Sequence, residues 1–98
     1  MRVIQKVPGR WPEVVEIEND LKALQQAVGG WIETVTLPYG LCVICNEEGR
    51  LMDLPFNTIF AGIPLVGTFL VVGTKGEDFA DVPEEYVPKL LLLMMNAL

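Results

Sequence analysis

The residue types that could carry catalysis are few in this chain, because the sequence contains no histidine. Without histidine there is no Ser/His or Cys/His nucleophilic pair, and both the commonest general base and the commonest zinc ligand are missing. The glycine-rich loops that hold phosphates and the nucleophile elbow of hydrolases are also absent from the sequence. We therefore expect no catalytic residues, no cofactor and no metal site, in a protein that is not an enzyme.

Cys42 and Cys45 have the C-x-x-C spacing of redox and zinc motifs, which lie on a turn or at a helix start. Here the motif lies within an apolar run typical of a strand, and the strand period of two places the two side chains on opposite faces. Such thiols cannot easily form a disulfide or chelate a metal. We expect both to be buried, reduced and free of metal, as free cysteines usually are.

Two groups of carboxylates could suggest acid–base or metal chemistry. Glu47 and Glu48 are adjacent in a turn, where neighbouring side chains point apart, so a solvated hairpin tip is favoured over a pair of catalytic acids. Glu77, Asp78 and Asp81 lack the alternating oxygen ligands and the distal glutamate of a calcium loop. An enzyme that uses only carboxylates is therefore the third hypothesis for this chain.

The candidates for a ligand pocket are Trp31, Tyr39, Asn46, Arg50, Asn57 and Thr68. Asn46, Asn57 and Thr68 stand among apolar neighbours, and a buried amide or hydroxyl must be hydrogen-bonded either by the backbone, as a structural staple, or by a ligand. Trp31 and Tyr39 flank turns, where an aromatic face could stack on a base or pack at the rim of the core. Both alternatives stay open.

The composition predicts one folded domain, residues 1–98. Hydrophobic residues make up 51% of the chain and the mean hydropathy is +0.39, which is enough apolar surface to offset the entropy of ordering. The net charge is −6 and the basic residues are spread singly, so we expect no binding to nucleic acid. The acidic cluster between Glu13 and Asp20 could mimic DNA, but a solvated helix start explains it as well.

The sequence also bears on location. Residues 1–6 lack the apolar stretch of a secretory signal. The longest apolar run, Leu90 to Met95, is far shorter than the ~20 residues that a membrane span requires. We therefore expect a cytoplasmic protein that does not cross a membrane.

The first half of the chain predicts two strands and a helix. Residues 3–7 and 14–17 are short extended runs. Apolar residues then recur at helical spacing, with Asn19 or Asp20 able to cap the start and Gly29-Gly30 able to end the helix in a left-handed conformation. We expect a helix at about residues 19–28 that packs its apolar side chains on a sheet, namely Leu21, Leu24 and Val28.

The second half predicts more strands and a C-terminal helix. Residues 31–37, 41–46 and 51–54, separated by turns, suggest a three-stranded antiparallel meander. Residues 55–64 suggest an irregular connection with one helical turn at 58–61, and residues 65–72 a buried strand closed by a turn at 73–76.

The last segment should begin a helix at Asp81 or Val82, with Pro83 in its first turn. Because Pro88 would break or kink that helix, we expect the final helix to run from Pro88 to Ala97. The fold class is thus α+β: a mainly antiparallel sheet with one packed central helix and a C-terminal helix.

Three stretches, Val14 to Ile32, Val43 to Asn57 and Gly67 to Gly73, resemble a small uncharacterised domain family carried by bacteriophages, plasmids and integrative elements. The run I-E-N-x-L-x-A-L-Q-x-x-V-G-G followed by C-N-E-E-G-x-L carries the resemblance, which covers nearly the whole chain. Thr58 departs from that family, where a basic residue follows the asparagine, and this puts a role in binding anions in doubt.

The resemblance implies a binding role, because small phage proteins commonly block defence proteins or take up defence signals. The first hypothesis is an immune-evasion protein of a phage or mobile element. It would sequester a small nucleotide-derived signal, of Thoeris or CBASS type, without catalysis, in a pocket closed by oligomerisation. The alternative is a protein-binding inhibitor or regulator of a host enzyme, docking through an acidic face or an exposed sheet edge.

The run from Leu90 to Met95 also predicts self-association. The helix of the resembled family is polar on one face, whereas six consecutive apolar residues here make a helix apolar all round. One small sheet covers only part of that circumference. We therefore expect a homo-oligomer, a dimer or a tetramer built from dimers, with Leu92 and Met95 at the interface.

Overall fold

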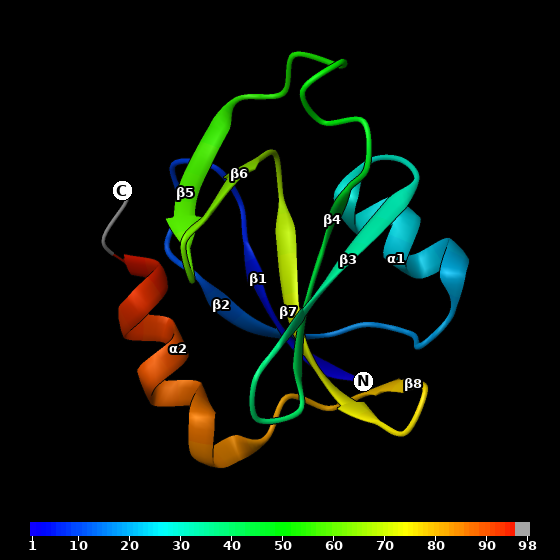
Figure 1. Cartoon of the computed structure of the whole chain (residues 1–98), viewed down its shortest axis with the longest axis vertical. Helices are drawn as coiled ribbons and strands as arrows, with labels where there is room; N and C mark the ends of the chain where they lie inside the picture. Colours follow the sequence, from blue (N-terminus) through cyan, green and yellow to red (C-terminus); the bar gives the residue numbers. More distant parts are fainter. Residues whose placement is uncertain (96–98) are drawn as a thin grey trace.

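The computed structural model describes residues 1–95. A six-stranded antiparallel sheet forms the middle layer. Helix α1 (Leu21–Val28) covers one face, whereas helix α2 (Val87–Met94) and a separate two-stranded sheet lie on the other (Figure 1). The predicted α+β class, with one helix packed on an antiparallel sheet and a second helix near the C-terminus, is confirmed.

The main sheet has the strand order β2-β1-β7-β4-β3, and β8 pairs with the end of β7. These strands are β1 (Arg2–Lys6), β2 (Glu13–Glu16), β3 (Ile32–Leu37), β4 (Leu41–Asn46), β7 (Phe69–Lys75) and β8 (Asp78–Ala80). Strand β7 therefore lies at the centre, between β1 and β4. The two edges of the sheet are β2 and β3.

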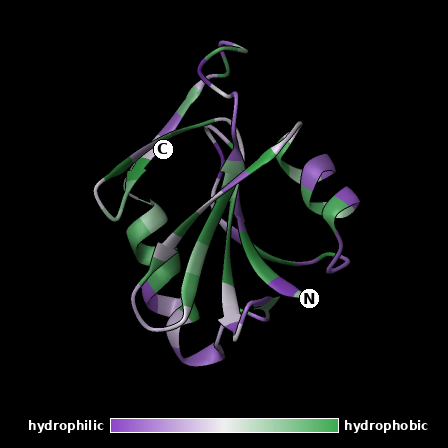
Figure 2. Ribbon diagram, turned by 45° about the vertical axis from the view of Figure 1, so that its right-hand side comes forward, coloured by the Kyte–Doolittle hydropathy of each residue, from purple (hydrophilic) through white to green (hydrophobic). Residues whose placement is uncertain are grey.

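The central strands separate two hydrophobic cores, because alternate side chains point to opposite faces. All six residues of β4 are buried, and Val43 and Cys45 belong to the core under α2 while Cys42 and Ile44 belong to the core under α1. Figure 2 shows these central strands mainly in hydrophobic colours. The prediction that Cys42 and Cys45 are buried on opposite faces is confirmed, and both thiols are free.

Helix α1 begins and ends as the sequence predicts. The Asp20 carboxylate accepts a hydrogen bond from the Ala23 backbone N–H (2.8 Å), and Gly29 ends the helix with a φ of 81°. Leu24 is buried, but Leu21 is 54% exposed, so its expected burial was wrong. In Figure 1 the helix starts to the side of the sheet and runs toward it, and Leu21 at its first position stays exposed while Leu24 and Val28 are buried.

The predicted meander over residues 31–54 is wrong in its third strand. Residues 47–53 form turns closed by local bonds, from the Met52 N–H to the Glu48 carbonyl (2.9 Å) and from the Leu54 N–H to the Gly49 carbonyl (3.0 Å). The place beside β4 is taken by β7. Strand β7 is apolar on both faces, as its buried position requires, whereas residues 51–54 contain Asp53.

Residues 55–64 form a hairpin and not an irregular connection with a helical turn. Strands β5 (Phe56–Phe60) and β6 (Ile63–Val66) pair through a two-residue turn, in which Ala61 and Gly62 have φ values of 51° and 77°. This left-handed pair fits the twist of a hairpin. The predicted strand 65–72 is also divided, because Gly67, with a φ of 70°, turns the chain from the small sheet into β7.

The C-terminal segment differs from prediction at its start. Strand β7 extends to Lys75, so the expected turn at 73–76 comes later and leads into β8. The predicted helix start at Asp81 or Val82 is wrong, because Pro83 is extended and only a 3-10 turn (Glu84–Tyr86) follows it. The predicted start of the final helix at Pro88 is confirmed to within one residue, since α2 begins at Val87 and Pro88 lies in its first turn, where proline costs no hydrogen bond. The predicted end at Ala97 lies outside the described residues. Within residues 1–95, neither helix has the length and apolar character needed to span a membrane.

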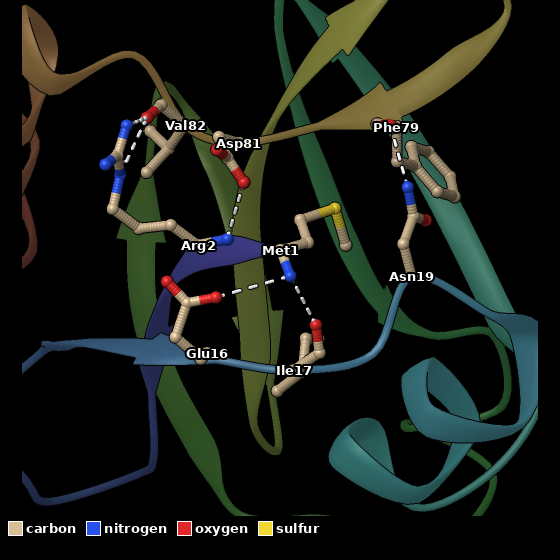
Figure 3. A network of polar contacts seen from close by, with 8 residues as sticks. All are labelled: Met1, Arg2, Glu16, Ile17, Asn19, Phe79, Asp81 and Val82. Atoms are coloured by element: carbon tan, nitrogen blue, oxygen red, sulfur yellow. Dashed lines mark hydrogen bonds and ion pairs between the residues drawn. The ribbon is translucent and has the colours of Figure 1, made fainter.

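Polar contacts join three segments that are distant in sequence (Figure 3). The amino group of Met1 donates to the Ile17 carbonyl (2.7 Å), and Asn19 Nδ2 donates to the Phe79 carbonyl (2.9 Å). The guanidinium of Arg2 donates to the Val82 carbonyl (3.0 Å). These contacts hold two connecting segments at the end of the sheet: the segment before α1, which contains Ile17 and Asn19, and the segment after β8, which contains Val82.

The packing of α1 gives a first prediction. Replacing Leu24 by alanine is expected to lower the free energy of unfolding by about 2–4 kcal/mol, because it leaves a cavity in the core under α1. Leu21→Ala, on the same helix, is the matched control and should cost less than about 1 kcal/mol. Urea denaturation measures both, and equal losses for the two variants would contradict this packing.

Candidate functional site

A hollow of about 390 Å³ lies between the β3–β4 hairpin and the β5–β6 hairpin. We call it the β3 hollow. Its walls are formed by β3, β4, the turns after β4 and strand β6, and its polar residues are Glu33, Cys45, Asn46, Glu47 and Arg50. The rest of the wall is apolar. The β3 hollow thus brings together two of the six predicted residues, Asn46 and Arg50.

The charges around the β3 hollow are unequal. Glu33 and Glu47 contribute two carboxylates, whereas Arg50 is the one cation that residues 1–95 place in its wall. Because all three residues are exposed, their charges act at the mouth of the hollow. The β3 hollow therefore favours a ligand that carries a positive charge or several hydrogen-bond donors.

The Cys45 thiol in this wall is a poor nucleophile. Its Sγ lies 3.8 Å from Glu33 Oε2 and donates a weak hydrogen bond to it. Burial, and then the Glu33 carboxylate, raise the pKa of Cys45 to about 11. Burial also raises the pKa of Cys42 on the opposite face. Since the thiolate is the reactive form, both cysteines are held in the unreactive state near neutral pH.

Asn46 is a structural staple. Its Nδ2 donates to the Val28 carbonyl (3.1 Å) and its Oδ1 accepts from the Glu48 N–H (2.8 Å), so one side chain joins the end of α1, strand β4 and the turn after it. A Cβ on Gly30 would come within 2.9 Å of Asn46 Nδ2, so glycine there leaves room for the staple. Of the two alternatives for Asn46, hydrogen bonding by the backbone or by a ligand, the structure shows bonding by the backbone.

Asn57 is a second staple, and it fixes the β5–β6 hairpin. Its Nδ2 donates to the carbonyls of Lys6 and Gly67, both at 2.8 Å. Asn57 Oδ1 is buried and has no hydrogen-bond partner among the described residues. The neighbouring Thr58 is also buried, so this position presents no group for binding anions at the surface.

Lys6 is a buried cation that the sequence analysis missed. The side chain is fully buried, and its Nζ donates to the Val7 carbonyl (3.2 Å). Burial lowers the pKa of Lys6, because desolvation disfavours the charged form. The strand period was the available signal, since Lys6 follows the buried Ile4 by two residues on the same face.

The other predicted residues lie apart from the β3 hollow. Trp31 precedes β3 and is 62% exposed, and Thr68 is half-buried between β6 and β7. Tyr39, which is 78% exposed, lines a separate apolar groove of about 430 Å³ together with residues of β5 and α2. We call it the α2 groove. The six predicted residues therefore do not form one pocket in a single chain.

The α2 groove contains residues that the sequence analysis did not select. Its walls include Leu37, Tyr39, Phe60, Tyr86, Lys89 and Leu93. The rings of Tyr39 and Tyr86 lie 6.1 Å apart between centroids, which is contact distance for an aromatic pair. Only the fold could bring these residues together, because they come from three parts of the chain that are distant in sequence: β3 with the turn after it, β5, and the 3-10 turn with α2. Within residues 1–95, no three acidic or cysteine side chains gather into a metal site.

Comparison with known proteins identifies a family but no activity. Residues 1–93 match the family model described as "Domain of unknown function (DUF3846)". Searches of curated proteins and of solved structures give no match.

The environment of Cys45 gives a prediction. At pH 8, a thiol reagent should label Cys45 in the native protein on the order of a hundredfold more slowly than free cysteine, because the raised pKa leaves little thiolate. Glu33→Gln removes the neighbouring charge and should speed labelling at Cys45, with Cys42 as the internal control. Rapid labelling of Cys45 in the native protein, or no effect of Glu33→Gln, would show that this environment is not as described.

Proposed function

The chain belongs to the DUF3846 family, and we propose that it acts by contact with other proteins and not by catalysis, as an inhibitor or regulator of a host enzyme. The observation that supports this proposal is the open outer edge of β3, which pairs only with β4 among the described residues. A separate surface for contact between copies of the chain is apolar and lies on α2. Leu92, Leu93 and Met95 are 65%, 48% and 37% exposed, and we call them the α2 face. Contiguous exposed apolar side chains mark protein interaction sites.

A second copy of the chain is the partner that we propose for the α2 face. A stable interface buries about 800 Å² per subunit, which is more than three side chains supply. The contact would therefore extend from α2 across the α2 groove to Tyr39. This surface is almost free of charge, since Lys89 is the one charged residue in the wall of the groove among those that the structure describes. Two copies could therefore meet there without burying carboxylates.

Self-association through the α2 face can be tested by measuring the molar mass of the protein in solution. The wild-type chain should be a dimer or larger by light scattering at micromolar concentration, and the double variant Leu92→Glu, Met95→Glu should be a folded monomer, because buried glutamates would be unpaired. The matched control, Val14→Glu with Leu21→Glu, adds the same charge at exposed positions elsewhere and should keep the assembly. A monomeric wild type, or a double variant that still assembles, would contradict the proposal.

A second proposal keeps the role that the sequence analysis placed first: uptake of a nucleotide-derived defence signal in the cytoplasm of a host bacterium. The size of the β3 hollow supports it, since its volume of about 390 Å³ falls in the range of small-molecule sites, whereas its charges do not. Arg50 offers a cation to one phosphate. Glu33 and Glu47 would repel further phosphates, and could instead accept hydrogen bonds from amino groups of a base.

The test of this second proposal uses a cyclic dinucleotide and cyclic ADP-ribose as probes. Sequestration should raise the melting temperature, because a ligand that binds only the native state stabilises it, and heating should release the probe unchanged. Arg50→Ala should abolish the shift, and Lys75→Ala, which removes an exposed cation outside the β3 hollow, should leave it intact. An unchanged melting temperature with both probes would count against this role, and a chemically altered probe would indicate an enzyme.

A further inference from the structure

We propose that β3 is the docking edge for an extended segment of a partner protein, and that the β3 hollow receives a lysine or arginine side chain of that segment. The inference rests on the proposed protein-binding function, and it names the surface and the chemistry of the target. Four observations carry it: an open strand edge, the contrast with the opposite edge, the position of the β3 hollow, and the charge around it.

The outer side of β3 has unpaired backbone groups. Among the described residues, β3 pairs only with β4. The Trp31 carbonyl accepts from the Glu47 N–H (2.8 Å), so the alternation of an antiparallel pair turns the N–H and carbonyl groups of Ile32, Thr34 and Thr36 away from β4. In residues 1–95, no turn or side chain forms a hydrogen bond to these outward groups. They are free to pair with an added strand.

The opposite edge of the sheet lacks these properties. Strand β2 has four residues and begins and ends with glutamate, and short charged edges discourage pairing with other chains. Strand β3 has six residues, contains neither proline nor a bulge, and carries a single charge at Glu33. Of the two edges, β3 is therefore the better template for another strand.

The β3 hollow lies where side chains of an added strand would point. Glu33 and Val35 form part of its wall, and their backbone groups face β4. Residues opposite them on an added antiparallel strand would form the closely spaced type of pair, with Cβ atoms roughly 4.5–5.5 Å apart. Their side chains would lie on the same face as Glu33, at the mouth of the hollow.

The charge at this mouth selects a basic side chain. Glu33 and Glu47 outnumber Arg50, and the whole chain carries a net charge of −6, which steers basic partners toward it. Trp31 lies two residues before Glu33 on the same face and is 62% exposed, so its ring is available to a cation. The partner is thus an extended, basic segment of protein.

The probe is a synthetic peptide of six residues, the length of β3, that alternates lysine with valine and has blocked ends. Its matched control replaces each lysine by glutamate. Isothermal titration calorimetry with the full chain should detect binding of the lysine peptide in the micromolar range. The glutamate peptide should not bind.

Two variants separate the backbone and the charge contributions. Thr34→Pro removes an outward N–H that forms no hydrogen bond within the fold, and an edge strand tolerates this change. The variant should weaken binding of the lysine peptide at least about tenfold, because one hydrogen bond to the peptide is lost. The control Thr34→Ala keeps the N–H and should bind the peptide as the wild type does. The double variant Glu33→Gln, Glu47→Gln should weaken binding about fivefold or more. If Thr34→Pro failed to fold, the charge variant and the two peptides would still test the basic side chain, and hydrogen exchange of the outward β3 amides in the complex would test the edge.

Each outcome of this experiment has a meaning. Equal binding of the lysine peptide to wild type and to folded Thr34→Pro would show that the peptide is held by general electrostatic attraction. It would overturn the proposal that β3 is the docking edge. Equal binding of the lysine and glutamate peptides would overturn the proposal that the β3 hollow selects a basic side chain. No binding of the lysine peptide at about 1 mM would overturn the whole inference. Self-association through the α2 face is read separately from mass, so failure of that proposal and failure of this one remain distinguishable.

Discussion

The pairing of β4 with β7 is the constraint on which the rest of this structure depends. Both strands are buried on both faces, so each contributes alternate side chains to two cores, and each face of the sheet then needs a cover. Helix α1 covers one face, and α2 with the β5–β6 hairpin covers the other. Gly73 of β7 shows how close this packing is, because a Cβ there would collide with the Asp81 carbonyl. The same topology leaves β3 at the edge of the sheet.

The parts of the fold that follow from local chemistry could be predicted from the sequence. The Asp20 cap and the left-handed Gly29 delimit α1, and the unbroken apolar run of β4 marks a buried strand. The parts that depend on tertiary partners could not. Residues 65–72 form one apolar run, and only Gly67 shows that the chain leaves one sheet there and enters another. Pro83 suggests a helix that begins at Asp81 or Val82, whereas the chain there is extended and then forms only a 3-10 turn.

The candidate site was predictable only in part, and for a physical reason. Asn46 and Asn57 stood out as polar residues in apolar runs, and the structure shows that both are held by backbone groups of the fold. Glu33 gives no such signal, because an exposed glutamate in an alternating strand is ordinary. Its importance depends on β3 being an edge and on β6 lying opposite, which are properties of the topology. Lys6 differs from Glu33, because the strand period places it on the same face as the buried Ile4 and could have indicated its burial.

The central claim is that this domain recognises an extended basic segment at the open edge of its sheet. Amide hydrogen exchange along β3, measured with and without the lysine peptide, tests that claim most directly. The account predicts that the amides of Ile32, Thr34 and Thr36 exchange rapidly in the free protein and become protected in the complex, while those of β2 do not change. Protection at β2, or unchanged exchange at these three amides when the peptide is bound, would contradict it.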